Sequence, residues 1–227
     1  MPKNNVMEKI NYQKILDKTI AEITESGKRP SLLLHACCAP CSSYVIEYLS
    51  RIFDITLLYY NPNISPAEEY EKRSAELARL AREMEGIERV KVVSAPYTPG
   101  DFYEIARGLE TLPEGGERCF KCYRLRLEYS AKYARENEFD YFSTTLSISP
   151  HKNAEVLNRI GGELSEKYGV PYLFSDFKKK NGYKRSIELS VKYGLYRQNY
   201  CGCQAGKRLH AYDDGGESPL TNGDGNI

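Results

Sequence analysis

The chain has 227 residues, of which 41% are hydrophobic and 28% charged, a composition that suits one globular domain and excludes a disordered protein. Its 32 basic and 31 acidic side chains nearly cancel, so overall charge gives no argument for a nucleic-acid or membrane partner. No run approaches the ~18 apolar residues of a membrane helix, and the first residues lack the apolar core of a secretory signal. We therefore expect a cytoplasmic protein with no membrane partner.

Helical and strand patterns alternate along the chain. Ser42 or Ser43 is the expected N-cap of the second helix. Five strands alternating with helices predict an α/β fold, a single-domain Rossmann-like parallel sheet with helices on both faces. The expected strands are 31–35, 55–60, 90–94, 140–145 and 171–174, and the expected helices are 8–26, 42–49, 66–85, 101–109, 120–136, 152–167 and 184–193.

This pattern divides the chain into three parts. Residues 1–29 are expected to form an N-terminal helical arm, and residues 30–210 the α/β domain that carries the candidate chemistry. Residues 211–227 are rich in Gly, Asp and Asn and lack periodicity, so they are expected to form a flexible C-terminal tail.

Cysteine is the unusual part of the composition. The seven cysteines fall into three groups: Cys37, Cys38 and Cys41; Cys119 and Cys122; Cys201 and Cys203. Small buried core cysteines are the ordinary explanation for one such residue, but tight groups in a cytosolic protein indicate metal or redox chemistry. Cys41 also falls at or near a helix N-terminus, where the dipole stabilises the thiolate that a metal needs.

Three kinds of thiol site are compatible with these groups. A structural zinc site uses four ligands and leaves three thiols unexplained, and a dithiol redox enzyme needs only one C-x-x-C pair. An iron–sulfur cluster takes up to four thiolates, which leaves about three for a second metal, with a carboxylate as a further ligand. Asp176, after the fifth expected strand, is the candidate carboxylate, and a helix cap or turn is its competing interpretation. His35, at the end of the first strand, is a candidate metal ligand or proton donor, or a hydrogen-bonded structural residue.

Two basic segments flank the proposed site. One surrounds the second cysteine pair and includes Arg118 and Arg126; the other runs from Lys178 to Arg185 without an acidic residue. A solvated charged face is the ordinary interpretation. The interleaved aromatic residues instead favour RNA, because basic side chains bind phosphates and aromatic rings stack on splayed bases. The candidate RNA-binding residues are Lys178, Lys179, Lys180, Tyr183, Lys184, Arg185 and Arg197.

Six motifs in order resemble the cobalamin-independent epoxyqueuosine reductases, the QueH family. They run from about Leu32 to Cys203 and are HACCAPC at 35–41, YNPNI at 60–64, RCFKCY at 118–123, FSTTLSISPHKN at 142–153, DFKKKNGYKRS at 176–186 and LYRQNYCGC at 195–203. Each motif alone is weakly specific, whereas the ordered set is highly specific. All seven cysteines fall within these motifs.

The resemblance implies an activity, a fold and a cofactor set. Members reduce the epoxide of epoxyqueuosine, at the wobble position of tRNAs with GUN anticodons, to queuosine in the last step of its synthesis. Their fold is similar to the adenine-nucleotide α-hydrolase-like folds. They carry a 4Fe–4S cluster and an adjacent second iron held by cysteines with a carboxylate, they use no cobalamin and no ATP, and they need an external electron donor. Which thiols hold which metal is not decided by the motifs.

Two other functions compete with this one. A tRNA thiolation enzyme would need a Gly-rich ATP loop after the first strand, where this chain has HACCAPCS without a glycine. A zinc-dependent RNA-binding module without redox activity predicts a colourless protein that contains only zinc. The sequence therefore favours an iron–sulfur oxidoreductase acting on tRNA.

Overall fold

The computed structural model describes residues 10–87, 90–198 and 200–204. Four parallel strands form one sheet in the order β3-β2-β1-β4, with β1 paired to both β2 and β4. Parallel strands need crossover connections, and helices supply them here. The strands are β1 (Ser31–His35), β2 (Asp54–Tyr59), β3 (Val90–Ser94) and β4 (Tyr141–Thr144), and the helices are α1 (Tyr12–Glu25), α2 (Ala39–Leu49), α3 (Ala67–Glu83), α4 (Pro99–Ala106), α5 (Glu117–Glu136), the 3₁₀ helix η1 (Thr145–Ile148), α6 (Ala154–Tyr168) and α7 (Gly182–Lys192).

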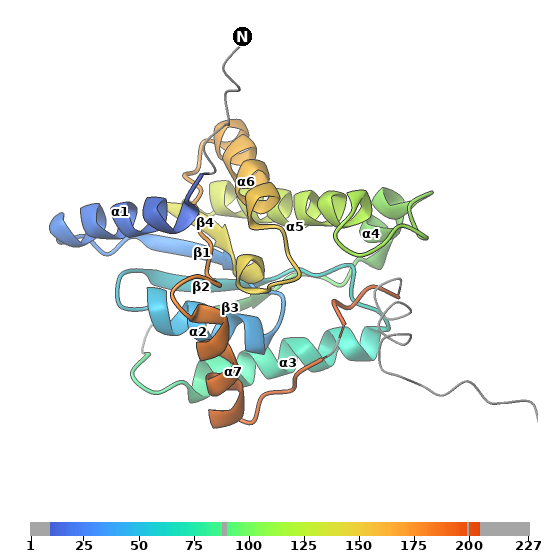
Figure 1. The fold of residues 1–227 in the computed structure, drawn as a ribbon, viewed down its shortest axis with the longest axis horizontal. Helices are drawn as coiled ribbons and strands as arrows, with labels where there is room; N and C mark the ends of the chain where they lie inside the picture. Colours follow the sequence, from blue (N-terminus) through green and yellow to red (C-terminus); the bar gives the residue numbers. More distant parts are fainter. Residues whose placement is uncertain (1–9, 88–89, 199, 205–227) are drawn as a thin grey trace, which may run out of the picture.

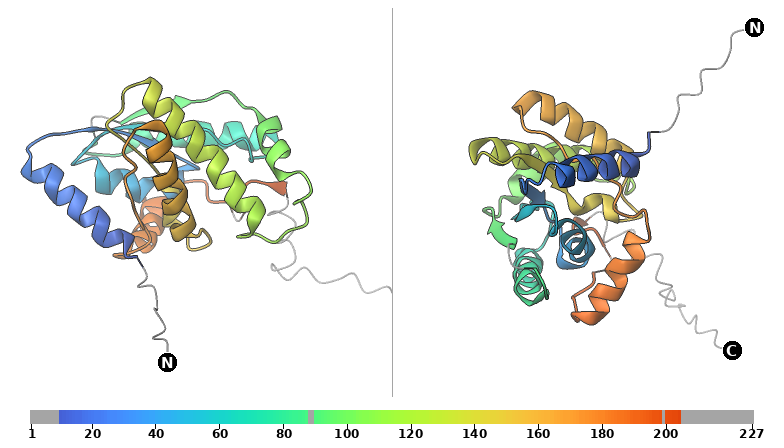
Figure 2. Two further views of the ribbon diagram at one scale, coloured as in Figure 1. Left: turned by 90° about the horizontal axis from the view of Figure 1, so that it is seen from above. Right: turned by 90° about the vertical axis from the view of Figure 1, so that its left-hand side faces the viewer.

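Helices cover both faces of the sheet, as predicted. Figures 1 and 2 show α5 and α6 on one face and α2, α3 and α7 on the other. Successive residues of β1 supply the two cores, because side chains alternate across a strand: Leu33 packs with α5 and α6, whereas Leu32 and Leu34 pack toward α2 and α3. The α/β Rossmann-like expectation is confirmed.

The prediction of a fifth strand at residues 171–174 is wrong. Residues 171–174 make only an isolated parallel bridge between Phe142 and Tyr172. Side chains form hydrogen bonds with the backbone groups that would otherwise pair with a neighbouring strand. The hydroxyl of Ser143 donates to the carbonyl oxygen of Leu173 at 2.9 Å, and the backbone N–H of Ser175 donates to Oδ1 of Asn158 at 2.9 Å.

The first helix begins later than the sequence pattern suggests, at Tyr12, where the side chain of Asn11 accepts a hydrogen bond from the backbone of Lys14. Residues 1–9 and the expected tail at 211–227 lie outside the described residues, so the three-part division stays a prediction. Among the helices that the structure describes, none combines the length and apolar character needed to cross a membrane.

Candidate metal centre

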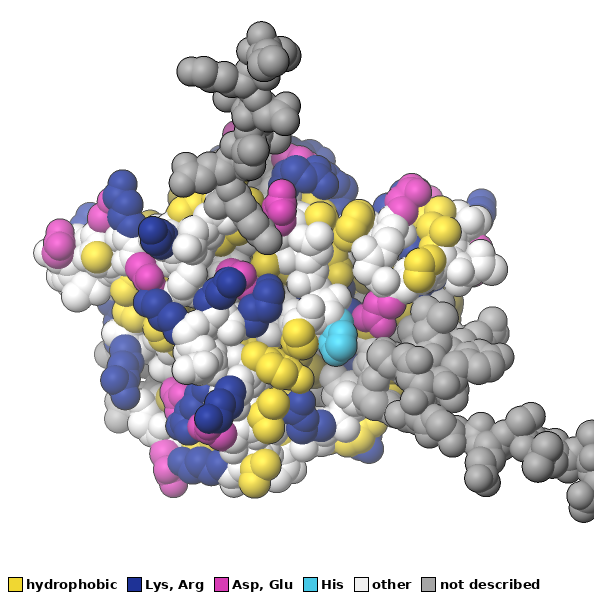
Figure 3. All heavy atoms as spheres, viewed as in Figure 1, with side chains coloured by type: hydrophobic (Ala, Val, Ile, Leu, Met, Phe, Trp, Pro, Cys, Tyr) yellow, Lys and Arg dark blue, Asp and Glu magenta, His cyan; other side chains and the backbone are white. Residues whose placement is uncertain are grey.

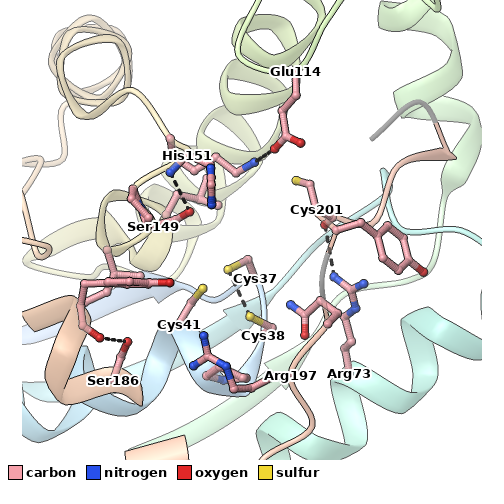
Figure 4. A pocket seen from close by; sticks show the side chains of 18 of the residues that line it. Cys37, Cys38, Cys41, Arg73, Glu114, Ser149, His151, Ser186, Arg197 and Cys201 are labelled. Carbon is pink, nitrogen blue, oxygen red and sulfur yellow. Dashed lines mark hydrogen bonds and ion pairs between the residues drawn. The ribbon is translucent and has the colours of Figure 1, made fainter. Parts of the chain in front are cut away.

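The first cysteine group lies where β1 ends. The N–H of Ala36 donates to the carbonyl oxygen of Leu58 at 2.9 Å, which extends the sheet pairing to the residue before Cys37. The ligand atoms of Cys37, Cys38 and Cys41 all lie within 4.8 Å of one another, and the first two sulfurs are 3.7 Å apart (Figure 4). This spacing is compatible with three thiolates on one metal ion.

The start of α2 differs from the expectation. Cys38, not Ser42 or Ser43, is the N-cap, and Pro40 occupies the first turn, where a missing N–H costs no hydrogen bond. The two serines lie inside the helix, and their hydroxyls donate to backbone carbonyl oxygens of residues 38 and 40. Starting α2 at this point places Cys38 and Cys41 in its N-terminal turn, close to Cys37.

The three thiols share negative charge unequally. Hydrogen bonds from Cys37 and Cys41 hold the pKa of Cys38 well below its ordinary value. The same interaction with Cys38 raises the pKa of Cys37 to about 11, and the thiols of Cys37 and Cys38 raise that of Cys41. The group therefore holds one thiolate readily and gains further charge when a cation binds and displaces the remaining protons.

A cavity of about 300 Å³ opens beside this group. The residues that line it come from segments far apart in the sequence. Glu114 precedes α5, His151 and Lys152 follow η1, and Tyr183 lies in the first turn of α7. Lys152 is buried, and its Nζ donates to a carboxylate oxygen of Glu114 at 2.6 Å. The cavity thus combines thiols, an aromatic ring and a buried cation, a mixture that suits a polar organic substrate next to a metal.

Four further cysteines surround a second, smaller void. Cys119, Cys122, Cys201 and Cys203 line it, and Cys201 lines the larger cavity as well. The backbone N–H of Gly115 donates to the sulfur of Cys119 at 3.3 Å, and burial raises the pKa of Cys122 to about 12. The structure therefore arranges the three sequence groups as one set of three and one set of four thiols that share a boundary.

Three buried arginines border these thiols, although the sequence analysis placed Arg118 and Arg126 in an RNA-binding segment. Arg73 and Arg126 line the larger cavity, and Arg118 and Arg126 line the smaller one. All three are at most 2% exposed, so they cannot reach the phosphates of an RNA. Each retains a buried guanidinium nitrogen, Nη2, without a hydrogen-bond partner among the described residues.

A family model described as epoxyqueuosine reductase QueH matches residues 32–208, most of the chain and every cysteine described above. The chain belongs to the epoxyqueuosine reductase QueH family. It is 41% identical over 211 residues to the epoxyqueuosine reductase QueH of Streptococcus pyogenes serotype M1, which covers 92% of this chain and 83% of the relative. It is 44% identical over 200 residues to that of Staphylococcus epidermidis, covering 86% of this chain and 84% of the relative, and 37% identical over 179 residues to that of Thermotoga maritima, covering 76% and 88%.

Membership of the QueH family confirms the resemblance found in the sequence motifs. It also leaves the zinc-dependent RNA-binding module without support. The seven cysteines that the QueH motifs contain are the same residues that line the two voids, so the motif cysteines are brought together in space.

His35 does not line the cavity of this QueH-family chain. Its ring is fully buried, with Nε2 3.0 Å from the carbonyl oxygen of Tyr60 and Nδ1 3.0 Å from the hydroxyl of Thr144. Because a carbonyl only accepts, Nε2 carries the proton and Nδ1 accepts from the hydroxyl. Burial lowers the pKa of His35 to about 4. These contacts favour the structural interpretation, and its role as ligand or proton donor stays a prediction.

Asp176 likewise lies outside the lining of the cavity. Its carboxylate accepts a hydrogen bond of 2.6 Å from Nζ of Lys178. Glu114 is instead the carboxylate that the lining contains. Glu114 is not among the residues predicted from the sequence, because its position depends on how the loop before α5 folds over the cavity, which the sequence pattern does not reveal.

The candidate RNA-binding residues of this QueH-family chain divide into three kinds. Lys180 pairs with Asp17 at 2.7 Å, and Arg185 pairs with Glu47 at 2.8 Å, so both charges are partly satisfied within the protein, as is that of Lys178. Lys179 and Lys184 are exposed, and no ion pair is found for either among the described residues. Tyr183 and Arg197 line the cavity. Figure 3 shows Lys and Arg side chains mixed with acidic ones over the face that carries α7.

Proposed function

We propose that this chain is an epoxyqueuosine reductase acting on tRNA, which reduces the epoxide of epoxyqueuosine at the wobble position to queuosine, the last step of queuosine biosynthesis. The observation that carries the proposal is the convergence of seven motif cysteines on two adjoining voids, the larger of which has a volume of about 300 Å³. Removing the epoxide oxygen takes two electrons and two protons and yields an alkene and water. The site must therefore deliver both electrons and protons to the substrate. An external donor supplies the electrons.

The thiols fit two metal groups. A 4Fe–4S cluster takes four thiolates, and we assign it to Cys119, Cys122, Cys201 and Cys203, which border the smaller void. The remaining Cys37, Cys38 and Cys41 are assigned to the second iron, because their ligand atoms already lie within 4.8 Å of one another. The buried arginine nitrogens without partners support this fit, since metal–thiolate groups carry the negative charge that buried cations require.

When bound, the iron groups supply one-electron redox chemistry and Lewis acidity. Lys152 contributes a fixed cation: despite its burial, the neighbouring side chains of Cys201, Tyr123 and Glu114 raise its pKa above the ordinary value. A lysine that holds its proton so firmly stabilises negative charge developing on the departing oxygen and is a poor proton donor. We assign proton delivery to Tyr183 or His151, whose side chains line the cavity.

The substrate is a tRNA with a GUN anticodon, which places the reaction in the cytoplasm. Lys179 and Lys184 lie on either side of Tyr183 in the sequence where α7 begins; both lysines are exposed, and Tyr183 lines the cavity. We propose that these lysines bind anticodon phosphates while Tyr183 stacks on the modified base. Gly182 makes this position possible: a Cβ there would lie 2.0 Å from the carbonyl oxygen of Phe177, so only glycine lets α7 begin at this point.

The first test is the iron, sulfide and zinc content of anaerobically prepared protein, with its visible spectrum. Sulfide at the level of one cluster and iron in excess of one cluster are expected, followed by turnover of epoxyqueuosine-containing tRNA with a chemical reductant. A colourless protein that holds only zinc after reconstitution with iron and sulfide would overturn the proposal, because the reaction would then have no electron source.

A further inference from the structure

Arg126 occupies a distinctive place between the two cysteine groups. It is 1% exposed and lines both the larger cavity and the smaller void. It follows Cys122 by one helical turn of α5, so both side chains lie on the same buried face of that helix. A positive charge buried this deeply requires a negative group nearby.

The hydrogen bonds that the structure describes for this guanidinium all go to neutral groups. Nε of Arg126 donates to the carbonyl oxygen of Cys122 at 3.3 Å, and Nη1 donates to Oδ1 of Asn61 at 3.4 Å. Nη2 is buried without a hydrogen-bond partner among the described residues, and in that part of the chain no carboxylate forms an ion pair with this guanidinium. Arg73, by contrast, pairs with Glu69 at 2.7 Å.

A guanidinium cannot relieve this situation by losing its proton, because its pKa lies far above neutrality. The thiols of Cys122, Cys201 and Cys37 raise the pKa of Arg126 further, against the effect of burial. Cys122 and Cys201 belong to the group of four cysteines, and Cys37 belongs to the group of three. The balancing charge for Arg126 is therefore available from thiolates on either side and from no carboxylate that the structure describes.

We propose that Arg126 is the shared counter-charge of the two metal groups: its buried guanidinium stabilises the anionic metal–thiolate form at both, strengthens metal binding there and raises their reduction potentials. The proposal rests on the proposed function in one respect, that both cysteine groups bind metal. Arg126 is a positioning residue in this role, since it acts on the thiolate ligands and not on the substrate.

The test compares Arg126→Gln, which removes the charge, with Arg126→Lys, which retains a charge at shorter reach. Anaerobic titration of apoprotein with Co²⁺, followed by the thiolate-to-cobalt absorption, reports metal affinity without turnover. The two groups are separated by the backgrounds Cys37→Ser/Cys41→Ser and Cys122→Ser/Cys203→Ser. Arg126→Gln is expected to weaken Co²⁺ binding about tenfold or more at each group, the scale of one charge-assisted interaction of about 1.4 kcal/mol, and Arg126→Lys to weaken it less.

Arg118→Gln is the matched control, because Arg118 borders only the smaller void. It is expected to weaken cobalt binding at the four-cysteine group alone. A second readout is the midpoint potential of the reconstituted cluster, which is expected to fall in Arg126→Gln and to be largely restored in Arg126→Lys.

Urea unfolding separates this role from a purely structural one. Removing an uncompensated buried cation is expected to leave the apoprotein equally or more stable, whereas the metal-loaded protein is expected to lose stability. Equal destabilisation of both forms, or failure of the Arg126→Gln apoprotein to fold, would show a structural role and overturn the proposal. Unchanged cobalt affinity at either group would also overturn it. Absence of metal binding in the unsubstituted protein would overturn the proposed function itself.

Discussion

Nη1 of Arg73 donates a hydrogen bond of 3.2 Å to the carbonyl oxygen of Cys201, joining α3 to the segment that carries the last two cysteines. Figure 4 shows this contact at the edge of the cavity. Other contacts hold the same segment along α3: the N–H of Tyr196 donates to Glu76 at 2.8 Å, and the N–H of Ser65 donates to the carbonyl oxygen of Gly202 at 3.0 Å. Residues 195–198 and 200–204 are thus held against α3 and Ser65 by groups far from them in sequence.

Replacing Arg73 with leucine is expected to release this segment. The change breaks a buried ion pair and leaves the Glu69 carboxylate with the hydroxyl of Tyr196 but without its cationic partner, a loss of about 3 kcal/mol or more. Cys201 and Cys203 then lose their fixed position, so the sulfide content should fall while metal at Cys37, Cys38 and Cys41 is retained. Glu68→Gln, an exposed change on the same helix, is the control. Unchanged sulfide in Arg73→Leu would contradict this account of the segment.

The two cysteine groups are expected to lose metal separately. Cys38→Ala removes a ligand from the group of three and should abolish turnover while the fold and the sulfide content are largely retained. Cys122→Ala should remove the cluster and its sulfide. Metal analysis by mass spectrometry, together with circular dichroism, distinguishes these outcomes. Full activity in Cys38→Ala, or loss of sulfide in that variant and not in Cys122→Ala, would reject the assignment.

Much of the site could be predicted from local pattern. Cys37 and Cys38 directly follow a strand, and binding sites in parallel sheets form at the carboxyl ends of strands. Cys119, Cys122 and Arg126 follow helical spacing, so one helical face already contained the signal that Arg126 points toward the cysteines. That signal was assigned to RNA because its neighbours in sequence are basic.

Other parts depend on contacts that no local pattern contains. The division of seven thiols into three and four follows from the position of residues 200–204 against the N-terminal half of α3. The contribution of Glu114 and Lys152 follows from two loops that meet over the cavity. The predicted fifth strand is absent for a similar reason. The backbone pairing of residues 171–174 ends where the side chains of Ser143 and Asn158 form hydrogen bonds with the backbone of Leu173 and Ser175.

Two adjacent glycines of α6 provide a matched test of core packing. A Cβ on Gly161 would lie 2.4 Å from the ring of Tyr172, whereas one on Gly162 would lie 3.4 Å from the ring of Phe174. Gly161→Ala is therefore expected to destabilise the protein by about 1–3 kcal/mol through overpacking. Gly162→Ala should be neutral or stabilising by up to ~1 kcal/mol, the gain in helix propensity. Urea unfolding measures both, and equal effects of the two changes would contradict the packing described here.

Lys179→Ala/Lys184→Ala is expected to weaken tRNA binding and to reduce its dependence on salt. Each lost phosphate contact should lower the slope of log K against log salt by about 0.7–0.9. Lys132→Ala, an exposed lysine on α5, is the control. Fluorescence anisotropy with an anticodon stem-loop at several salt concentrations gives both quantities. Binding and slope that equal those of the control variant would remove α7 from the RNA-binding surface.

The buried hydroxyl of Tyr70, on α3, predicts a loss of stability in alkali. Burial raises the pKa of Tyr70 to about 12, and its hydroxyl donates to the carbonyl oxygen of Ala95 at 2.9 Å. The unfolded chain ionises this group near pH 10, so its stabilising effect is complete below pH 10 and is lost as the pH rises toward 12. Urea unfolding of Tyr70→Phe should therefore show a shallower decline over that interval and a loss of about 1 kcal/mol at pH 8. A decline as steep as in the unsubstituted protein would contradict the shift.

The late position of Cys201 and Cys203 in the chain also bears on when the protein can acquire its metal. Two of the four cysteines assigned to the cluster precede α6 and α7, and two follow them, so the ribosome must complete nearly the whole α/β domain before the fourth ligand emerges. The three-cysteine group, by contrast, is complete once α2 has been synthesised. A nascent chain therefore offers a lone site of three thiols long before it offers a cluster site, and the cluster can be delivered only after Cys203 has been synthesised.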